Sequence, residues 1–131
     1  MRRNSAGTLC YPSSKRVLNI PFEKNLTPSV IYGQPEIAWV GLREQDVDES
    51  YSISKLPITA LGKSWCDDAT DGFIKIITKN NLIYGAHIIS KEASSLIHIL
   101  LTAIQNKITL SEIKEMCFAH PTYAEGIFEL I

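Results

Sequence analysis

The sequence has no long apolar run, no strong excess of charge and no secretion signal. No stretch approaches the 18 consecutive apolar residues of a membrane-spanning helix, and residues 4–14 lack the apolar centre of a signal peptide. With a net charge of -1 and 21% charged residues, the chain has no basic excess that would favour a nucleic acid. We therefore expect a cytoplasmic protein that binds neither membranes nor nucleic acids.

Cysteine is scarce and poorly placed for a disulfide framework. Cys10, Cys66 and Cys117 are three widely spaced residues without a C-x-x-C pair, which favours reduced thiols. Cys117 and His120 do have the C-x-x-H spacing of two zinc ligands, but structural zinc sites usually bring two such pairs. The missing ligands would have to come from a cysteine or histidine elsewhere: Cys66, His87 or His98. We expect no metal site.

The apolar content that is present suits one domain. A chain of 131 residues with 45% hydrophobic content is long enough to bury a single core. Residues 1–26 contain glycine and prolines without a sustained period, so we interpret them as a weakly structured leader or remnant with one strand around residues 17–20. The domain itself is expected to occupy residues 27–131.

Stretches rich in β-branched residues come first along this domain. Asn80 and Asn81 separate two of them and tolerate the positive φ of a type I′ turn, which predicts a β-hairpin. Residues 43–50 and 59–72 are polar or glycine-containing connections in which we expect at most short helical turns. Each β-rich stretch is expected to form a strand: residues 30–32, 37–42, 51–56, 73–78 and 82–89.

The pattern changes to a helical period after these strands. Apolar residues from Ala93 to Ile104 fall on one stripe and predict a helix of about 13 residues. Thr109 and Glu112 have the spacing of a reciprocal capping box, which begins a second, shorter helix. Strands followed by helices favour an α+β fold, with an antiparallel β-sheet and helices packed on it, over a doubly wound parallel sheet.

Residues 117–126, CFAHPTYAEG, permit two interpretations. In the first, Thr122 and Glu125 form another capping box and Pro121 ends the preceding helix, so the segment only punctuates two helices. In the second, the Glu125 carboxylate reaches back to one ring nitrogen of His120 and leaves the other free to exchange a proton near neutral pH. The residues alone leave both interpretations open.

Four segments, in this order, resemble the C-terminal dimerisation domain of the pyridine nucleotide-disulfide oxidoreductases, also called flavoprotein disulfide reductases. The resemblance extends over about residues 27–129 and is closest to the dihydrolipoamide dehydrogenase branch of the family. The family fold agrees with the α+β sandwich expected from the order of strands and helices. The segments are TPSVIYGQPEIAWVGLRE, TDGFIKIITKNNLIYGAHIIS, EASSLIHILLTAIQNKITLSEI and AHPTYAEG.

This resemblance implies catalytic roles for His120 and Glu125. His120 would be the acid/base catalyst at a redox disulfide, Glu125 would orient it, and a cis His120–Pro121 bond would lie close to a flavin. The resemblance also implies a homodimer in which each pair serves the partner subunit's disulfide and FAD during NAD-linked oxidation of dihydrolipoamide. A lipoyl-bearing protein of a 2-oxo acid dehydrogenase complex would be a further partner.

The chain departs from the full family pattern in what it omits. It has neither a G-x-G-x-x-G loop nor a C-x-x-x-x-C pair, so FAD and NAD are expected in a full-length enzyme and neither is expected on this chain alone. Alone, it should be inactive, even if it forms part of an oxidoreductase. The alternative is a stand-alone, non-catalytic dimerisation or binding module with the same fold, in which His120 and Glu125 are vestigial.

Overall fold

The computed structural model describes residues 26–131, and the backbone of residues 2–3 and 9–10. Those two short stretches, β1 (Arg2–Arg3) and β2 (Leu9–Cys10), pair in an antiparallel manner. The strand expected at residues 17–20 lies outside the described residues, and the boundary near residue 27 stays a prediction.

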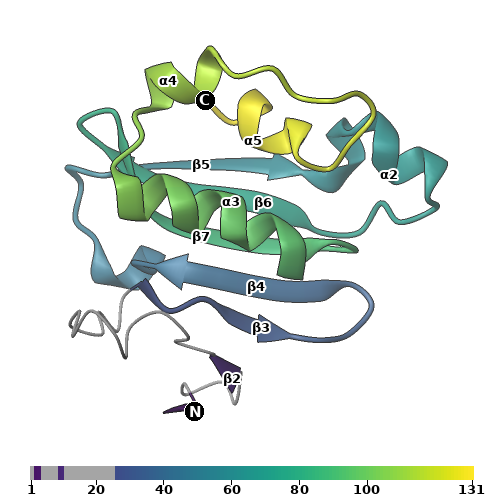
Figure 1. Cartoon of the computed structure of the whole chain (residues 1–131), viewed down its shortest axis with the longest axis horizontal. Helices are drawn as coiled ribbons and strands as arrows, with labels where there is room; N and C mark the ends of the chain where they lie inside the picture. The colour runs from purple at the N-terminus through teal and green to yellow at the C-terminus, as the bar shows by residue number, and fades with distance from the viewer. Residues whose placement is uncertain (1, 4–8, 11–25) are drawn as a thin grey trace, which may run out of the picture.

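An open antiparallel sheet forms the centre of the domain (Figure 1). Its strand order is β3-β4-β7-β6-β5, and every neighbouring pair is antiparallel. Each of the five expected strands is present, which confirms the antiparallel α+β class. Their bounds are β3 (Ser29–Ile31), β4 (Glu36–Gly41), β5 (Ser52–Pro57), β6 (Phe73–Lys79) and β7 (Leu82–Ser90).

The hairpin between β6 and β7 confirms the turn that the two asparagines predict. Asn80 and Asn81 have φ values of 50° and 65°, the left-handed region that asparagine enters at lower cost than most residues. This tight connection makes β6 and β7 neighbours at the centre of the sheet.

The longest helix follows the hairpin and agrees with the expected stripe. It spans 14 residues and ends where Lys107 takes a left-handed conformation. The next helix begins as expected: the Thr109 hydroxyl accepts from the Glu112 N–H at 3.2 Å, and the Glu112 carboxylate accepts from the Thr109 N–H at 2.7 Å. The α-helices in the described residues are α2 (Gly62–Cys66), α3 (Ala93–Asn106), α4 (Leu110–Lys114) and α5 (Glu125–Glu129).

The core lies between the sheet and the layer that contains α3, α4 and α5 (Figure 1). α3 packs against β4 and β7, and burying each of its larger aliphatic side chains contributes on the order of 2 kcal/mol. No helix among the described residues is long and apolar enough to cross a membrane. The fully buried core includes Val40, Ile58, Ile74, Ile76, Ile88, Ile97, Leu100, Tyr123 and Ile127.

A candidate acid/base site between two short helices

An irregular segment, residues 115–124, connects α4 to α5 and carries the candidate site. In Figure 1 it leaves α4, runs along the helix layer toward α2 and turns back into α5. The peptide bond between His120 and Pro121 is cis, as the family resemblance implied. The imidazole of His120 is held outward in solvent, with 77% of the side chain exposed.

Glu125, at the start of α5, bonds two groups of this segment at once. Its Oε1 lies 2.8 Å from Nδ1 of His120, and its Oε2 accepts a hydrogen bond from the Thr122 N–H at 2.7 Å. The Glu125 side chain is 26% exposed, so the protein covers most of it while His120 stays accessible. The structure thus brings together the two residues that the second interpretation of CFAHPTYAEG pairs.

The first interpretation of CFAHPTYAEG required two reciprocal hydrogen bonds between Thr122 and Glu125, and the structure contains one of them. The Thr122 hydroxyl donates to the Ala119 carbonyl oxygen at 2.8 Å and accepts nothing from the Glu125 backbone. α5 begins at Glu125 itself and its N-cap position is Ala124, so Thr122 lies too far before the helix to cap it. The hydrogen bond from the Thr122 N–H to Oε2 of Glu125 does form, and Oε1 of the same carboxylate remains available to His120.

The electrostatics of the pair define which nitrogen of His120 carries a proton. The Thr122 N–H and then His120 hold the pKa of Glu125 below its ordinary value of 4.5, so its carboxylate is ionised at neutral pH. Since an ionised carboxylate only accepts hydrogen bonds, Nδ1 of His120 must be the donor. The lone pair of Nε2 is then left to receive a proton from another molecule.

The residues of the zinc hypothesis do not assemble. Among residues 26–131, no three histidine, cysteine, aspartate or glutamate side chains are close enough to hold a metal ion. Cys66 and Cys117 are free thiols on the surface, and His98 is exposed on α3. His120 instead has the Glu125 carboxylate as its partner.

His87 lies on β7, in a setting unlike that of His120. Its Nδ1 is buried without a hydrogen-bond partner, and burial, followed by the nearby Lys75 charge, lowers its pKa from 6.5 to about 4. This histidine is therefore neutral at physiological pH. As the pH falls from 6.5 toward 4, the unfolded chain binds a proton there before the folded chain does, so the fold loses stability in that window.

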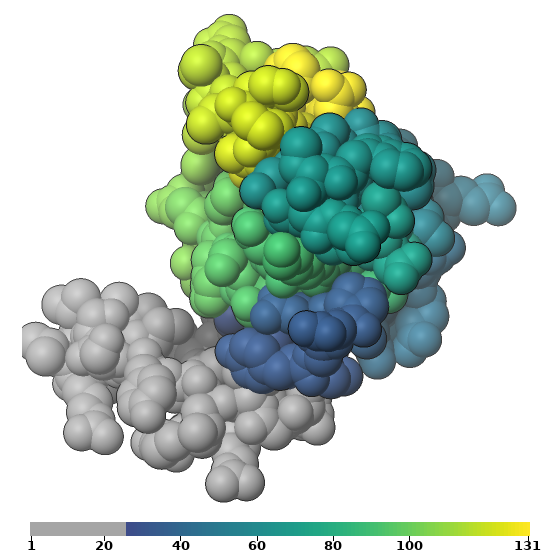
Figure 2. Space-filling model, turned by 90° about the vertical axis from the view of Figure 1, so that its right-hand side faces the viewer, coloured from purple at the N-terminus to yellow at the C-terminus, as the bar shows by residue number. Residues whose placement is uncertain are grey.

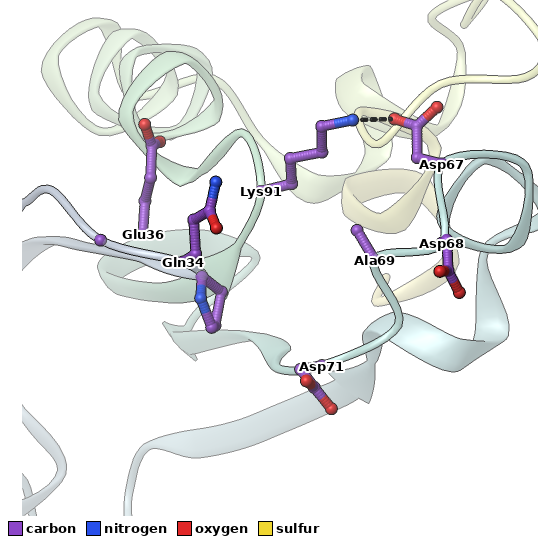
Figure 3. A pocket seen from close by; sticks show the side chains of 9 residues that line it. Gln34, Glu36, Asp67, Asp68, Ala69, Asp71 and Lys91 are labelled. Carbon is purple, nitrogen blue, oxygen red and sulfur yellow. Dashed lines mark hydrogen bonds and ion pairs between the residues drawn. The ribbon is translucent and has the colours of Figure 1, made fainter.

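A hollow of about 480 Å³ lies at the end of the domain where the β3–β4 turn faces the loop after α2 (Figures 2 and 3). Neither His120 nor Glu125 lines it. Lys91 spans part of it to bond Asp67 at 3.2 Å (Figure 3). Most of its charged lining is acidic: Glu36, Asp67, Asp68 and Asp71.

One residue of the site segment had no assigned role in the sequence analysis. Tyr123 is 1% exposed and belongs to the core. No signal in the sequence distinguishes Tyr123 from Phe118, because each is a single aromatic residue in the same irregular stretch. Only the packing of the chain shows which of them is buried.

Fold and site together define a small α+β domain that presents a carboxylate-bound histidine to solvent and has no glycine-rich nucleotide loop in its sequence. Residues 27–131 match the family described as "Pyridine nucleotide-disulphide oxidoreductase, dimerisation domain", and the chain belongs to that family.

Curated relatives agree with the family assignment. The chain is 33% identical over 115 residues to the mitochondrial dihydrolipoyl dehydrogenase of the dog, Canis lupus familiaris, and 34% identical over 115 residues to that of the pig, Sus scrofa. These matches cover 84% of this chain but 23% of each relative. The chain therefore spans about a quarter of the length of these relatives.

Solved structures show the same fold at lower identity. LpdA from Mycobacterium tuberculosis superposes with a TM-score of 0.82 at 23% identity, over 88% of this chain and 27% of that chain. The HOCl-induced flavoprotein disulfide reductase RclA from Escherichia coli gives 0.77 at 19% identity, over 88% of this chain and 29% of that chain. Both superpositions confirm the dimerisation-domain fold.

Proposed function

We propose that this chain serves as the dimerisation domain of a dihydrolipoamide dehydrogenase, where it supplies His120 and Glu125 to the redox disulfide of the partner subunit. The main support for this proposal is the 2.8 Å distance between Nδ1 of His120 and Oε1 of Glu125, together with a His120 side chain that is 77% exposed. The names of the curated relatives support dihydrolipoamide as the substrate.

In this role His120 moves a proton and Glu125 supports the resulting charge. Nε2 of His120 would take the proton of a substrate thiol, and the positive imidazolium would be stabilised by the ionised Glu125 carboxylate at Nδ1. The Thr122 N–H bond fixes that carboxylate, so the acceptor does not have to reorganise during proton transfer. General acid/base catalysis of this kind contributes roughly 10²- to 10⁴-fold in rate.

The residues present do not fit the two cofactors that the family uses. FAD and NAD carry phosphates, whereas the hollow beside the β3–β4 turn is lined mainly by carboxylates that would repel them. The sequence has no G-x-G-x-x-G loop. We therefore assign both cofactors to the remainder of a longer enzyme and assign none of the described residues to binding them.

The partners follow from the same proposal. A homodimer would place His120 of one subunit at the disulfide of the other, and a lipoyl-bearing protein of a 2-oxo acid dehydrogenase complex would deliver the substrate. A cytoplasmic location stays a prediction, since the curated relatives are mitochondrial by name.

A chimeric enzyme tests the proposal. Residues 27–131 would replace the matching segment of dog dihydrolipoyl dehydrogenase, and NAD reduction by dihydrolipoamide would be followed. We expect turnover that falls roughly 10²-fold or more in His120→Gln, the scale of lost acid/base catalysis. The matched control is His98→Gln, which changes an exposed histidine on α3 and should leave turnover unaffected. Equal turnover in both variants would support the non-catalytic module instead.

A further inference from the structure

The bend that carries His120 is held by side chains and not by the backbone. The chain bends at His120 and Pro121, and among residues 26–131 the stretch 117–122 neither donates nor accepts a backbone-to-backbone hydrogen bond. In a four-residue turn, the N–H of the last residue commonly bonds the carbonyl oxygen of the first. In residues 119–122 that bond would join the Thr122 N–H to the Ala119 oxygen, and a side chain has taken its place.

The hydroxyl of Thr122 provides this replacement. Its Oγ1 donates to the Ala119 carbonyl oxygen at 2.8 Å, while the Thr122 N–H donates to Oε2 of Glu125 at 2.7 Å. Because the hydroxyl supplies a donor to the Ala119 oxygen, the N–H is free to bind the carboxylate. One residue thus closes the bend with its side chain and fixes Glu125 with its backbone.

The other T-x-x-E motif shows what a threonine hydroxyl does when its proton goes to the glutamate. Oγ1 of Thr109 donates to Oε2 of Glu112 at 2.6 Å, and the Thr109 N–H donates to the same oxygen at 2.7 Å. A hydroxyl has one proton to donate, so Thr122, which gives that proton to Ala119, has none for Glu125. Both oxygens of Glu125 then remain for the Thr122 N–H and His120.

Together these hydrogen bonds form a ring around the bend. It passes from the Ala119 carbonyl to the Thr122 hydroxyl, from the Thr122 N–H to Oε2 of Glu125, and from Oε1 to Nδ1 of His120. The Thr122 N–H is also the strongest of the contacts that lower the pKa of Glu125. Whatever keeps this N–H on the carboxylate therefore acts on the partner of His120.

We propose that Thr122 is a positioning residue of the acid/base site, whose hydroxyl closes the bend at Ala119 and thereby reserves its N–H for Glu125 and the second Glu125 oxygen for His120. Without the hydroxyl, the Ala119 oxygen loses its donor, and the Thr122 N–H is the donor at the turn position that replaces it. The carboxylate would then lose its fixed orientation. This inference deepens the proposed function and takes its catalytic meaning from it, whereas the hydrogen bonds belong to the chain itself.

The test uses the 131-residue protein and two NMR measurements that need no turnover. Carboxyl NMR follows the titration of Glu125, and nitrogen NMR of the ring shows which nitrogen of neutral His120 carries the proton. In Thr122→Val, which removes the hydroxyl and keeps the branched shape, we expect the pKa of Glu125 to rise toward 4.5. The ratio of Nδ1-protonated to Nε2-protonated imidazole should fall about fivefold, as expected for one weakened hydrogen bond. Thr122→Ser restores the hydroxyl and should restore both signals.

Matched controls separate positioning from general destabilisation. Thr102→Val removes a hydroxyl that also donates to a backbone carbonyl at 2.8 Å, that of His98 on α3, and should leave both signals at their wild-type values. His120→Gln identifies the ring signals of His120 by their loss. The hydrogen exchange of a core amide such as that of Ile76 should not change in Thr122→Val, because an exposed hydrogen bond contributes little to stability.

Two results would overturn the inference. One is a folded Thr122→Val protein in which the Glu125 titration and the His120 ring signals are unchanged. The other is a Thr122→Ser protein that shifts as much as Thr122→Val, since the hydroxyl would then have no part in the effect. Thr122→Ala removes the same hydroxyl and replaces Thr122→Val if that variant does not fold.

Failure of this inference is separate from failure of the proposed function, because both NMR signals come from the chain alone. An inactive chimeric enzyme, combined with shifted signals in Thr122→Val, would contradict the proposed function and support the positioning role of the Thr122 hydroxyl. An active chimera with unchanged signals in Thr122→Val would do the reverse.

Discussion

The segments that begin α4 and α5 share the sequence T-x-x-E, yet the structure uses them differently. At α4, Oε2 of Glu112 accepts hydrogen bonds from both the N–H and the hydroxyl of Thr109, at 2.7 and 2.6 Å, and the motif closes on itself. At α5, Glu125 gives one oxygen to the Thr122 N–H and the other to His120. The first motif starts a helix, whereas the second holds a histidine.

The difference teaches that the surroundings decide what a local motif does. The α5 segment is drawn onto the core at Tyr123 and at Gly126, where an added Cβ would meet Cδ1 of Ile74 at 2.6 Å. The same docking starts α5 three residues after Thr122 and brings the Glu125 carboxylate beside His120. The following variants test this comparison, from the largest expected effect to the smallest.

Catalysis should distinguish the two glutamates most strongly. In the chimeric enzyme, Glu125→Gln removes the charge that supports a protonated His120 and should lower turnover roughly 10²-fold. Glu112→Gln changes the equivalent position of the other motif and should stay within about twofold, because, among the described residues, the Glu112 carboxylate hydrogen-bonds to Thr109 alone. Similar losses in the two variants would show that both glutamates act only through folding.

The next largest effect is expected on stability, from a substitution that disturbs the packing beneath α5. Gly126→Ala forces a Cβ against Ile74 and Leu61, and overpacking of this kind should lower the free energy of unfolding by about 1–2 kcal/mol. Gly62→Ala, at the start of α2, is the matched control because its Cβ would meet nothing within 4 Å. Urea unfolding of the 131-residue protein measures both. A neutral Gly126→Ala variant would argue against docking at this glycine.

The two threonines should differ in stability as well. Thr109→Ala removes a capping hydroxyl and should cost about 1 kcal/mol. Thr122→Ala removes an exposed bond to the Ala119 carbonyl and should cost less than about 0.5 kcal/mol. The same urea experiment reports both values, and a reversed order would mean that Thr122 is the stronger cap.

The acid titration of the two glutamates gives the smallest and most specific contrast. Hydrogen bonds lower the pKa of both, from Thr109 for Glu112 and from Thr122 and then His120 for Glu125. Since each pKa is lowered in the fold, the stability it contributes is present above 4.5 and is lost as the pH falls through the folded value. Carboxyl NMR of His120→Gln should show a raised Glu125 pKa and an unchanged Glu112 pKa. Equal behaviour of the two carboxyls would show that His120 does not act on Glu125.

Much of the fold was predictable because its signals are local. The alternation of β-branched residues, the Asn80–Asn81 turn and the apolar stripe of α3 each reflect contacts between residues close in sequence. The capping box at Thr109 was predictable for the same reason. The box at Thr122 was not, because core contacts made by Tyr123 and Gly126 move the start of α5 beyond its reach.

The candidate site, like the fold, was predictable from the sequence only where its residues lie close together along the chain. The order and type of the strands and helices, and the residues that could form a histidine–carboxylate pair, follow from the sequence, since periodicity and short spacings set them. Only the tertiary structure determined that Glu125 turns one oxygen to His120 and the other to the Thr122 N–H, and that Tyr123 is buried in the core. These contacts join residues from separate elements, and the packing of those elements on one sheet brings them within reach.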